Sequence, residues 1–190
     1  LLLEQTGVKA HFGQLSCKGS VELIRIAREK GIPVTADVAM HHLHLTDAAI
    51  DGFNSFAHVR PPLRSEADRA ALREGVNSGV IDAICSDHQP LDASAKLAPF
   101  PATEPGMSTL ETVLPLGLQL VRDGVLTESR LIAALTHRPA DVLGLEKNTG
   151  WLLIDPTAQW TVGADTLLST GKNTPWFGQV MQGKVVRVFD

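Results

Sequence analysis

The 190-residue sequence lacks the features that mark several specialised classes of protein. It has only two cysteines, Cys17 and Cys85, which lie far apart and form no Cys-x-x-Cys pair. This usage is typical of reduced, buried thiols in an intracellular protein. No apolar run is long enough to span a bilayer, and no cleavable signal pattern is present. We therefore expect a cytoplasmic protein without a membrane partner.

A large excess of charge of one sign is also missing. The net charge is -4, which favours neither nucleic acid nor an anionic membrane as a partner. With 44% hydrophobic and 20% charged residues, the composition is that of a globular domain with a core, or of part of a larger one. The first residue is Leu rather than Met, and residues 1–7 resemble the last turns of a helix that ends at a glycine. The chain is expected to start within a longer protein.

Strand and helix patterns alternate along most of the chain. A strand over Val8–Leu15, a helix over Lys18–Lys30 and a strand over Pro33–Met40 predict a parallel sheet. Three such strand–helix units are predicted, over residues 8–30, 33–50 and 80–143.

A closed (β/α)8 barrel takes about 250 residues, so the pattern predicts an α/β fold equivalent to the last three units of a TIM-like barrel. This part covers residues 1–145, and residues 146–190 form a small β-rich subdomain. An open sheet of this kind exposes a strand edge, so we expect the remaining strands from elsewhere in the protein or from another copy in an oligomer.

Local signals define several element ends. Ser65 and Asp68 have the spacing of a capping box for a helix that runs to about Asn77. A helix over Leu110–Arg122 is expected to kink or shift at Pro115, and another begins at Thr127 and ends near Leu143. Residues 89–107 are rich in proline and are predicted to form an irregular loop, which inside a compact domain is often functional.

The stretch Val80–Pro90 contains the main candidate for chemistry. An apolar strand pattern ends in Ser86-Asp87-His88, and the carboxyl ends of barrel strands line the active face. Asp87 is thus a candidate catalytic carboxylate, and the alternative is an aspartate that caps the loop after the strand. His88 is expected to pack or form hydrogen bonds, and Cys85 to lie in the core.

An ordered set of motifs resembles one family. The motifs are Lys18-Gly-Ser-Val21, Val34-Thr-Ala-Asp-Val38 leading to His41-His-Leu43, Pro61-Pro-Leu-Arg64, Ser86-Asp-His88, Leu110-Glu-Thr-Val-Leu-Pro115 and, in the tail, Asp155-Pro156, Trp160-Thr-Val162, Asn173-Thr-Pro175 and Gly183-Lys-Val-Val186. Together they resemble the C-terminal half of long-type dihydroorotases of the amidohydrolase superfamily. The resemblance implies a TIM-like barrel with a small β-sandwich and a zinc site that opens or closes the dihydroorotate ring, with zinc activating a water molecule.

The family's site residues carry over only in part. Asp87 falls on the aspartate that binds metal and moves the proton, and Gly106 falls on a glycine whose backbone faces the substrate. Gln14 stands where the family has a histidine ligand of the metal, and a neutral amide is a poorer zinc ligand than imidazole. Arg60 and Leu91 replace an asparagine and a histidine that contact substrate. The remaining ligands would lie before residue 1.

These changes favour a catalytically inactive dihydroorotase-like protein of de novo pyrimidine biosynthesis, without a cofactor. The resemblance implies that it acts as a structural partner of aspartate carbamoyltransferase. The alternatives are an active zinc-dependent dihydroorotase and an amidohydrolase with another substrate.

Other basic residues leave further hypotheses open. Arg60 could pair with Asp87 and fill the former substrate site. His11 could reach the site if the alignment shifts, although residues three apart on a strand point to opposite faces. The cluster at His41, His42 and His44 could resemble a metal site, but structural or solvent-facing roles are favoured, and His58 and His137 are expected at the surface.

Overall fold

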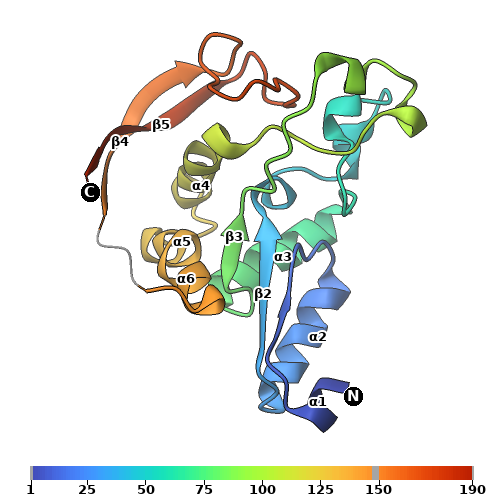
Figure 1. Ribbon diagram of the computed structural model, residues 1–190, viewed down its shortest axis with the longest axis vertical. Coiled ribbons are helices and arrows are strands. Elements are labelled where there is room, and N and C mark those ends of the chain that lie inside the picture. The colour runs from blue at the N-terminus through green and yellow to red at the C-terminus, as the bar shows by residue number, and fades with distance from the viewer. Residues whose placement is uncertain (1, 147–149, 190) are drawn as a thin grey trace.

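The computed structural model describes residues 2–146 and 150–189, which form a parallel sheet, helices packed against it and an antiparallel ribbon (Figure 1). In chain order the helices and strands are α1 (Leu2–Thr6), β1 (Ala10–Phe12), α2 (Lys18–Glu29), β2 (Val34–Ala39), α3 (Glu66–Ser78), β3 (Ala83–Cys85), α4 (Val113–Arg122), α5 (Glu128–Leu135), α6 (His137–Leu143), β4 (Trp151–Thr161) and β5 (Val180–Phe189). Short 3₁₀ helices lie between them: η1 (Met40–Leu43), η2 (Asp47–Ile50), η3 (Ser55–Ala57), η4 (Ala93–Lys96), η5 (Phe100–Ala102) and η6 (Leu110–Thr112).

The parallel sheet has the order β1-β2-β3, which confirms the predicted strand–helix units. Strands β1 and β3 are shorter than predicted, because the chain leaves the regular strand conformation after β1 and before β3. After β1 the chain turns at Gln14, whose φ is 55°, and before β3 the N–H of Ile81 donates to the carbonyl of Gly75 in α3. The sheet therefore keeps its expected order and direction, with β1 and β3 of three residues each.

Strand β2 separates an apolar face of the sheet from a polar one. Val34, Ala36 and Val38 are buried, while Thr35 and Asp37 alternate with them and remain partly accessible. The apolar side chains belong to a core that also contains Leu72, Val76, Ile81, Ile84, Leu116 and Leu120. Thr35 and Asp37 project to the opposite side, which would be the interior in a closed barrel.

The predicted capping box is confirmed. The Ser65 hydroxyl accepts from the N–H of Asp68, and the Asp68 carboxylate accepts from the N–H of Ser65. At Pro115 the predicted shift is confirmed and the kink is wrong, because α4 begins at Val113 and the proline lies in its first turn, where an N–H has no intrahelical acceptor. Residues 110–112 form η6 instead.

The helix predicted from Thr127 to Leu143 is two helices, separated at Thr136. Pro139 explains the break: in a continuous helix it has no N–H to donate to the carbonyl of Leu135, and its ring would clash with that carbonyl. The beginning is as predicted, since the Thr127 hydroxyl accepts from the N–H of Arg130.

The tail is an antiparallel pair of strands, β4 and β5. The stretches predicted at 152–154 and 159–162 join in β4, with an irregularity in the pairing between Asp155 and Gln159. There the Asp155 carboxylate accepts from the N–H groups of Thr157 and Ala158. The boundary after residue 145 stays a prediction, and residues 147–149 lie outside the described part of the chain.

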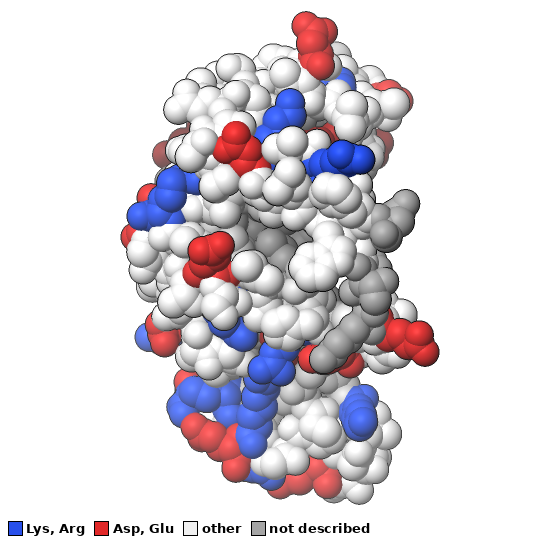
Figure 2. All heavy atoms as spheres, turned by 90° about the vertical axis from the view of Figure 1, so that its left-hand side faces the viewer, with Lys and Arg blue, Asp and Glu red and all other residues white. Residues whose placement is uncertain are grey.

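Among the described residues, no helix is long and apolar enough to cross a membrane. On the face shown in Figure 2, basic and acidic side chains are interspersed rather than gathered by sign. On α2, Arg25 forms ion pairs with Glu22 and Glu29.

His44, which follows η1, links that segment to α4. Its Nε2 donates to the carbonyl of Leu116 at 3.1 Å, and burial, followed by the nearby Arg73, lowers the pKa of His44 to about 4. The folded-state pKa is below that of the unfolded chain, about 6.5. This contribution to stability is complete above about pH 6.5 and is lost as pH falls toward 4.

The free energy of unfolding should fall between about pH 7.5 and 5, because His44 binds a proton more readily in the unfolded chain. We predict that His44→Gln in the full-length protein makes this fall smaller. A change on the order of 1 to 2 kcal/mol is expected, because each pKa unit corresponds to about 1.4 kcal/mol before solvent screening. Urea unfolding at both pH values measures it, with the exposed His137→Gln as the control. Equal pH dependence in the parent and His44→Gln would contradict the prediction.

Candidate functional site

Gln14 and Asp87 meet at the carboxyl end of the parallel sheet. Each lies two residues beyond its strand, Gln14 after β1 and Asp87 after β3. Parallel strands bring such residues to one end of the sheet. The Gln14 Nε2 donates to Asp87 Oδ1 at 2.6 Å. Both residues have positive φ, 55° and 46°, a conformation that is unfavourable for side chains other than glycine and is often found at functional sites.

The two oxygens of Asp87 have different surroundings. Oδ1 accepts from Gln14 and, at 2.8 Å, from Gln89 Nε2. Oδ2 is buried without a hydrogen-bond partner, and His41 Nε2 lies 3.8 Å from it. One oxygen is thus held by two neutral amides, while the other is directed into a buried polar space.

His41 and His42 in η1 form the wall of that space. Both are buried, at 0% and 2% exposure, so a solvent-facing role for them is wrong. Their rings lie 4.6 Å apart, and among the described residues their ring nitrogens have no hydrogen-bond partner. Burial, followed by the neighbouring His42, lowers the pKa of His41 to about 3, and burial likewise lowers the pKa of His42. Neutral imidazoles therefore face Asp87.

Asp37 is a central residue of the site that the sequence reasoning missed. Its carboxylate accepts from the backbone N–H of Gln14 at 2.8 Å and from the thiol of Cys85 at 3.3 Å, and bonds with His11 Nε2 at 2.8 Å. The signal available in the sequence was an acidic residue at a non-core position of a buried strand. His11 also bonds with Thr35, so both its ring nitrogens are engaged away from Asp87.

Cys85 is only partly buried, although it was predicted to lie in the core. Its side chain shares the polar side of the sheet with Asp37. Burial, followed by Asp37, raises the pKa of this thiol, so it remains protonated and donates. Cys17, the other cysteine, is partly accessible as well and contacts Ser20.

His88 forms hydrogen bonds, as predicted. Its Nδ1 accepts from the N–H groups of Thr109 and Leu110, so the neutral ring carries its proton on Nε2. That nitrogen lies 3.3 Å from the Ser169 hydroxyl, which itself donates to Glu111. His88 thereby links the end of β3 to η6 and to the tail.

The loop over residues 89–107 folds back on itself beside Asp87. The N–H of Gln89 donates to the carbonyl of Met107, which brings the two ends of the loop together. Gly106 has φ of 141°, and a Cβ there would lie 2.9 Å from that of Gln89, so only glycine fits. Leu91 lies against the same point, where its methyl carbon would be 3.3 Å from such a Cβ.

Asn173, a buried residue from the tail, fastens this loop. Its Oδ1 accepts from the N–H of Leu91, and its Nδ2 donates to the carbonyls of Gln89 and Gly106. The sequence reasoning assigned it no role, because a contact across more than 60 residues leaves no periodic signal.

Arg60 does not pair with Asp87. In the described part of the chain no hydrogen bond or ion pair is formed by its guanidinium, and the contacts of Asp87 come from Gln14, Gln89 and His41. The hypothesis of a compensating ion pair is therefore wrong. Arg60 is exposed and lines a separate pocket with His58.

The described residues do not fit a zinc centre by themselves. They contain no group of three or more His, Cys, Asp or Glu side chains arranged to hold a metal ion. At the carboxyl end of the sheet, the position of one expected ligand is taken by Gln14, whose amide N–H points at Asp87 and offers no lone pair to a metal. Gln14 and Asp87 are thus joined to each other by a hydrogen bond.

Comparisons with known proteins agree with this fold. The chain is 47% identical to the dihydroorotase-like protein of Pseudomonas aeruginosa and 42% identical to the dihydroorotase of Pelobacter propionicus. These alignments cover 97% and 98% of this chain but 45% and 46% of the relatives. The chain therefore spans about half the length of the curated relatives it matches.

Two solved structures of this kind of protein have a similar fold. The L-hydantoinase of Arthrobacter aurescens matches with a TM-score of 0.90 at 25% identity, over 99% of this chain and 45% of that one. The inactive dihydroorotase-like domain of the CAD-like multifunctional protein of Chaetomium thermophilum matches with a TM-score of 0.75 at 26% identity, over 99% and 51%. A family model described as the amidohydrolase family matches residues 4–189. The chain thus belongs to the amidohydrolase family.

Proposed function

We propose that this chain belongs to a catalytically silent dihydroorotase-like protein of de novo pyrimidine biosynthesis, which serves as a structural partner of aspartate carbamoyltransferase. The observation that carries the loss of activity is the hydrogen bond from Gln14 Nε2 to Asp87 Oδ1, 2.6 Å long. Through this bond a neutral amide donates to one oxygen of Asp87, the residue that the resemblance assigns to metal binding.

The chemistry of the two side chains supports this proposal. An imidazole in place of Gln14 would offer a nitrogen lone pair, and its neighbouring carboxylate could share a cation with it. The Gln14 amide N–H instead donates to Asp87 Oδ1, and the Gln89 amide donates to the same oxygen. Asp87 in this arrangement accepts two hydrogen bonds at Oδ1 from neutral amides, and Gln14 shares no cation with it.

The partner role rests on the resemblance to dihydroorotase-like proteins that support aspartate carbamoyltransferase. One relative is named as inactive, the dihydroorotase-like domain from Chaetomium thermophilum, and the relative from Pseudomonas aeruginosa is named a dihydroorotase-like protein. These names describe those proteins, and the extension to this chain is part of the proposal.

An active zinc-dependent dihydroorotase is the second candidate. It is favoured by the unpartnered Oδ2 of Asp87, a buried carboxylate oxygen that a cation would satisfy, and by 42% identity to a protein named dihydroorotase. Its remaining ligands would have to come from residues before Leu1, and Gln14 would have to turn away from Asp87.

We predict that Gln14→Glu destabilises the full-length protein at neutral pH by about 2 kcal/mol. The substitution removes a hydrogen bond to a charged group and places two carboxylates in contact. Unfolding in urea measures the change, and the loss should shrink near pH 4.5, where the added carboxyl becomes protonated. Gln5→Glu, at an exposed position, is the matched control. Equal stability of Gln14→Glu and the parent at neutral pH would contradict the prediction.

We further predict that the purified full-length protein contains much less than one zinc per chain and does not hydrolyse dihydroorotate. Metal analysis by mass spectrometry and an absorbance assay for ring opening test both statements. An active dihydroorotase assayed in parallel confirms that the substrate and the buffer are suitable. Stoichiometric zinc together with ring hydrolysis would overturn the silent assignment.

For the partner role, we predict that the full-length protein co-elutes with aspartate carbamoyltransferase of the same organism in size-exclusion chromatography at micromolar concentration. Asp87→Asn should leave the complex intact, because a structural role does not need the carboxylate charge. Separate elution of the two folded proteins would contradict the partner role.

A further inference from the structure

Residues 92–105, the outer part of the 89–107 loop, close over the segment that carries His58, and we call them the flap. Two residues of the flap are buried, Lys96 at 6% and Thr103 at 4% exposure, and both are polar. Leu97, in contrast, is 82% exposed. The flap is therefore held closed by polar contacts more than by burial of apolar side chains.

These polar contacts meet at His58. Its Nδ1 lies 2.7 Å from the Thr103 hydroxyl, whose own proton is donated to the carbonyl of Phe100, so Nδ1 is the donor. The His58 carbonyl accepts from the Lys96 ammonium at 3.4 Å and from the N–H of Gly106 at 2.9 Å. His58 thus bonds to the loop at three places, through its ring and through its backbone.

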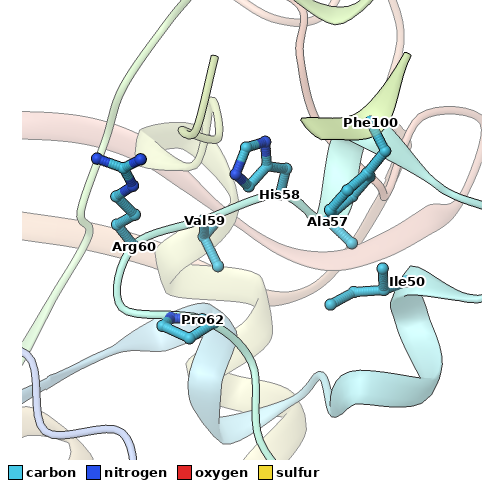
Figure 3. Close-up of a pocket in the computed structure, with 7 residues that line it drawn as sticks. All are labelled: Ile50, Ala57, His58, Val59, Arg60, Pro62 and Phe100. Carbon is cyan, nitrogen blue, oxygen red and sulfur yellow. The ribbon is translucent and has the colours of Figure 1, made fainter. Parts of the chain in front are cut away.

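Phe100, in η5, adds an apolar contact to the same ring. The centroids of the Phe100 and His58 rings lie 4.8 Å apart. Beside this contact lies a pocket of about 250 Å³, which Phe100 lines together with Ile50 and Ala57 (Figure 3). The flap is therefore not closely packed on this side, and a segment with few buried contacts opens at a small free energy.

The charged groups that face His58 are cations. Burial lowers the pKa of His58, and Lys96 from η4 and Arg60 from its own segment lower it further, against a smaller opposite effect of the bond to Thr103. Burial also lowers the pKa of Lys96, and the carboxylate of Glu104 offsets part of this effect. The residues of η5 carry no charge. A proton on His58 would thus place a second cation against Lys96.

Acidification therefore favours the open flap. With the flap closed the pKa of His58 is below its usual value, and in the open flap water would return it toward about 6.5. The open state then binds the proton more readily. Closure is fully stabilised above about pH 6.5 and loses stability as the pH falls below this value.

We propose that the flap is a pH-sensitive closure, shut while His58 is neutral and open once His58 takes up a proton. Opening separates Thr103 and Phe100 from His58 and uncovers Ala57, which is 1% exposed in the closed form. The two amides that donate to Asp87 belong to Gln14 and Gln89, outside the flap. The closure therefore does not depend on whether the site at Asp87 is active.

Hydrogen exchange of the full-length protein measures the opening. Protection of peptides over residues 95–106 is compared at about pH 7.5 and about pH 5.5, after correction for the intrinsic pH dependence of amide exchange. We expect this protection to fall by at least about threefold, because each unit between the two pKa values changes the closing equilibrium by up to about tenfold. Peptides from α2 should keep their protection.

Three variants locate the proton. In His58→Asn the side-chain N–H donates to Thr103 from the place of Nδ1 but does not titrate, so the pH dependence of flap protection should disappear. His137→Asn removes an exposed histidine outside the flap and is the matched control, which should keep the full dependence. Lys96→Met removes the neighbouring cation and should make the pH dependence smaller, even where protection is lower at both pH values.

The proposal is wrong if the flap and α2 lose protection equally, because the protein would then be losing stability as a whole, or if the flap loses none. It is also wrong if His58→Asn keeps the full pH dependence, or if Lys96→Met leaves it unchanged. The parent protein gives the first result without any substitution, so the test holds even where a variant does not fold. None of these results bears on the silent assignment, which zinc content and ring hydrolysis test.

Discussion

The hydrogen bond between the Gln14 amide and the Asp87 carboxylate determines the arrangement at the carboxyl end of the sheet. Both residues adopt positive φ, which costs on the order of 1 to 3 kcal/mol for each side chain other than glycine. Such conformations persist only where several contacts define them. Here Gln14 is held at its backbone by Asp37 and at its side chain by Asp87, and Asp87 is held also by Gln89. The strained geometry is therefore stabilised by the polar contacts themselves.

Strand β2 supports these polar contacts because one of its faces packs in the core and the other carries Asp37. Ala36 and Val38 are completely buried and fix the strand in the core. Asp37 lies between them in sequence and projects to the other side, where it contacts His11 of β1, Cys85 of β3 and the backbone of Gln14. A carboxylate with this many donors stays satisfied although it is largely removed from water. The core on one side thus positions the polar network on the other.

The sequence was sufficient for the features that depend on local pattern. Alternation and capping residues predicted the parallel strands and the start of α3 at Ser65, and the resemblance predicted that Gln14 and Asp87 share a site. Features that depend on distant contacts were beyond it. Asn173 acts on backbone groups more than 60 residues away, and no local pattern indicated that Arg60 would be exposed rather than paired with Asp87. The division of α5 from α6 could have been found, since Pro139 was visible in the sequence.

Shape and chemistry are maintained by different residues at this site, and this distinction bears on a non-catalytic role. Asn173 binds three backbone groups of the loop, and His88 accepts from two backbone N–H groups, so both define the course of the chain. Gly106 does the same, because a side chain there would collide with Gln89. Asp87, in contrast, is held at Oδ1 by the side-chain amides of Gln14 and Gln89. The course of the chain around the site is therefore fixed by Asn173, His88 and Gly106 without any contact to the Asp87 carboxylate, so a change in the chemistry at Asp87 can leave the shape of this region in place.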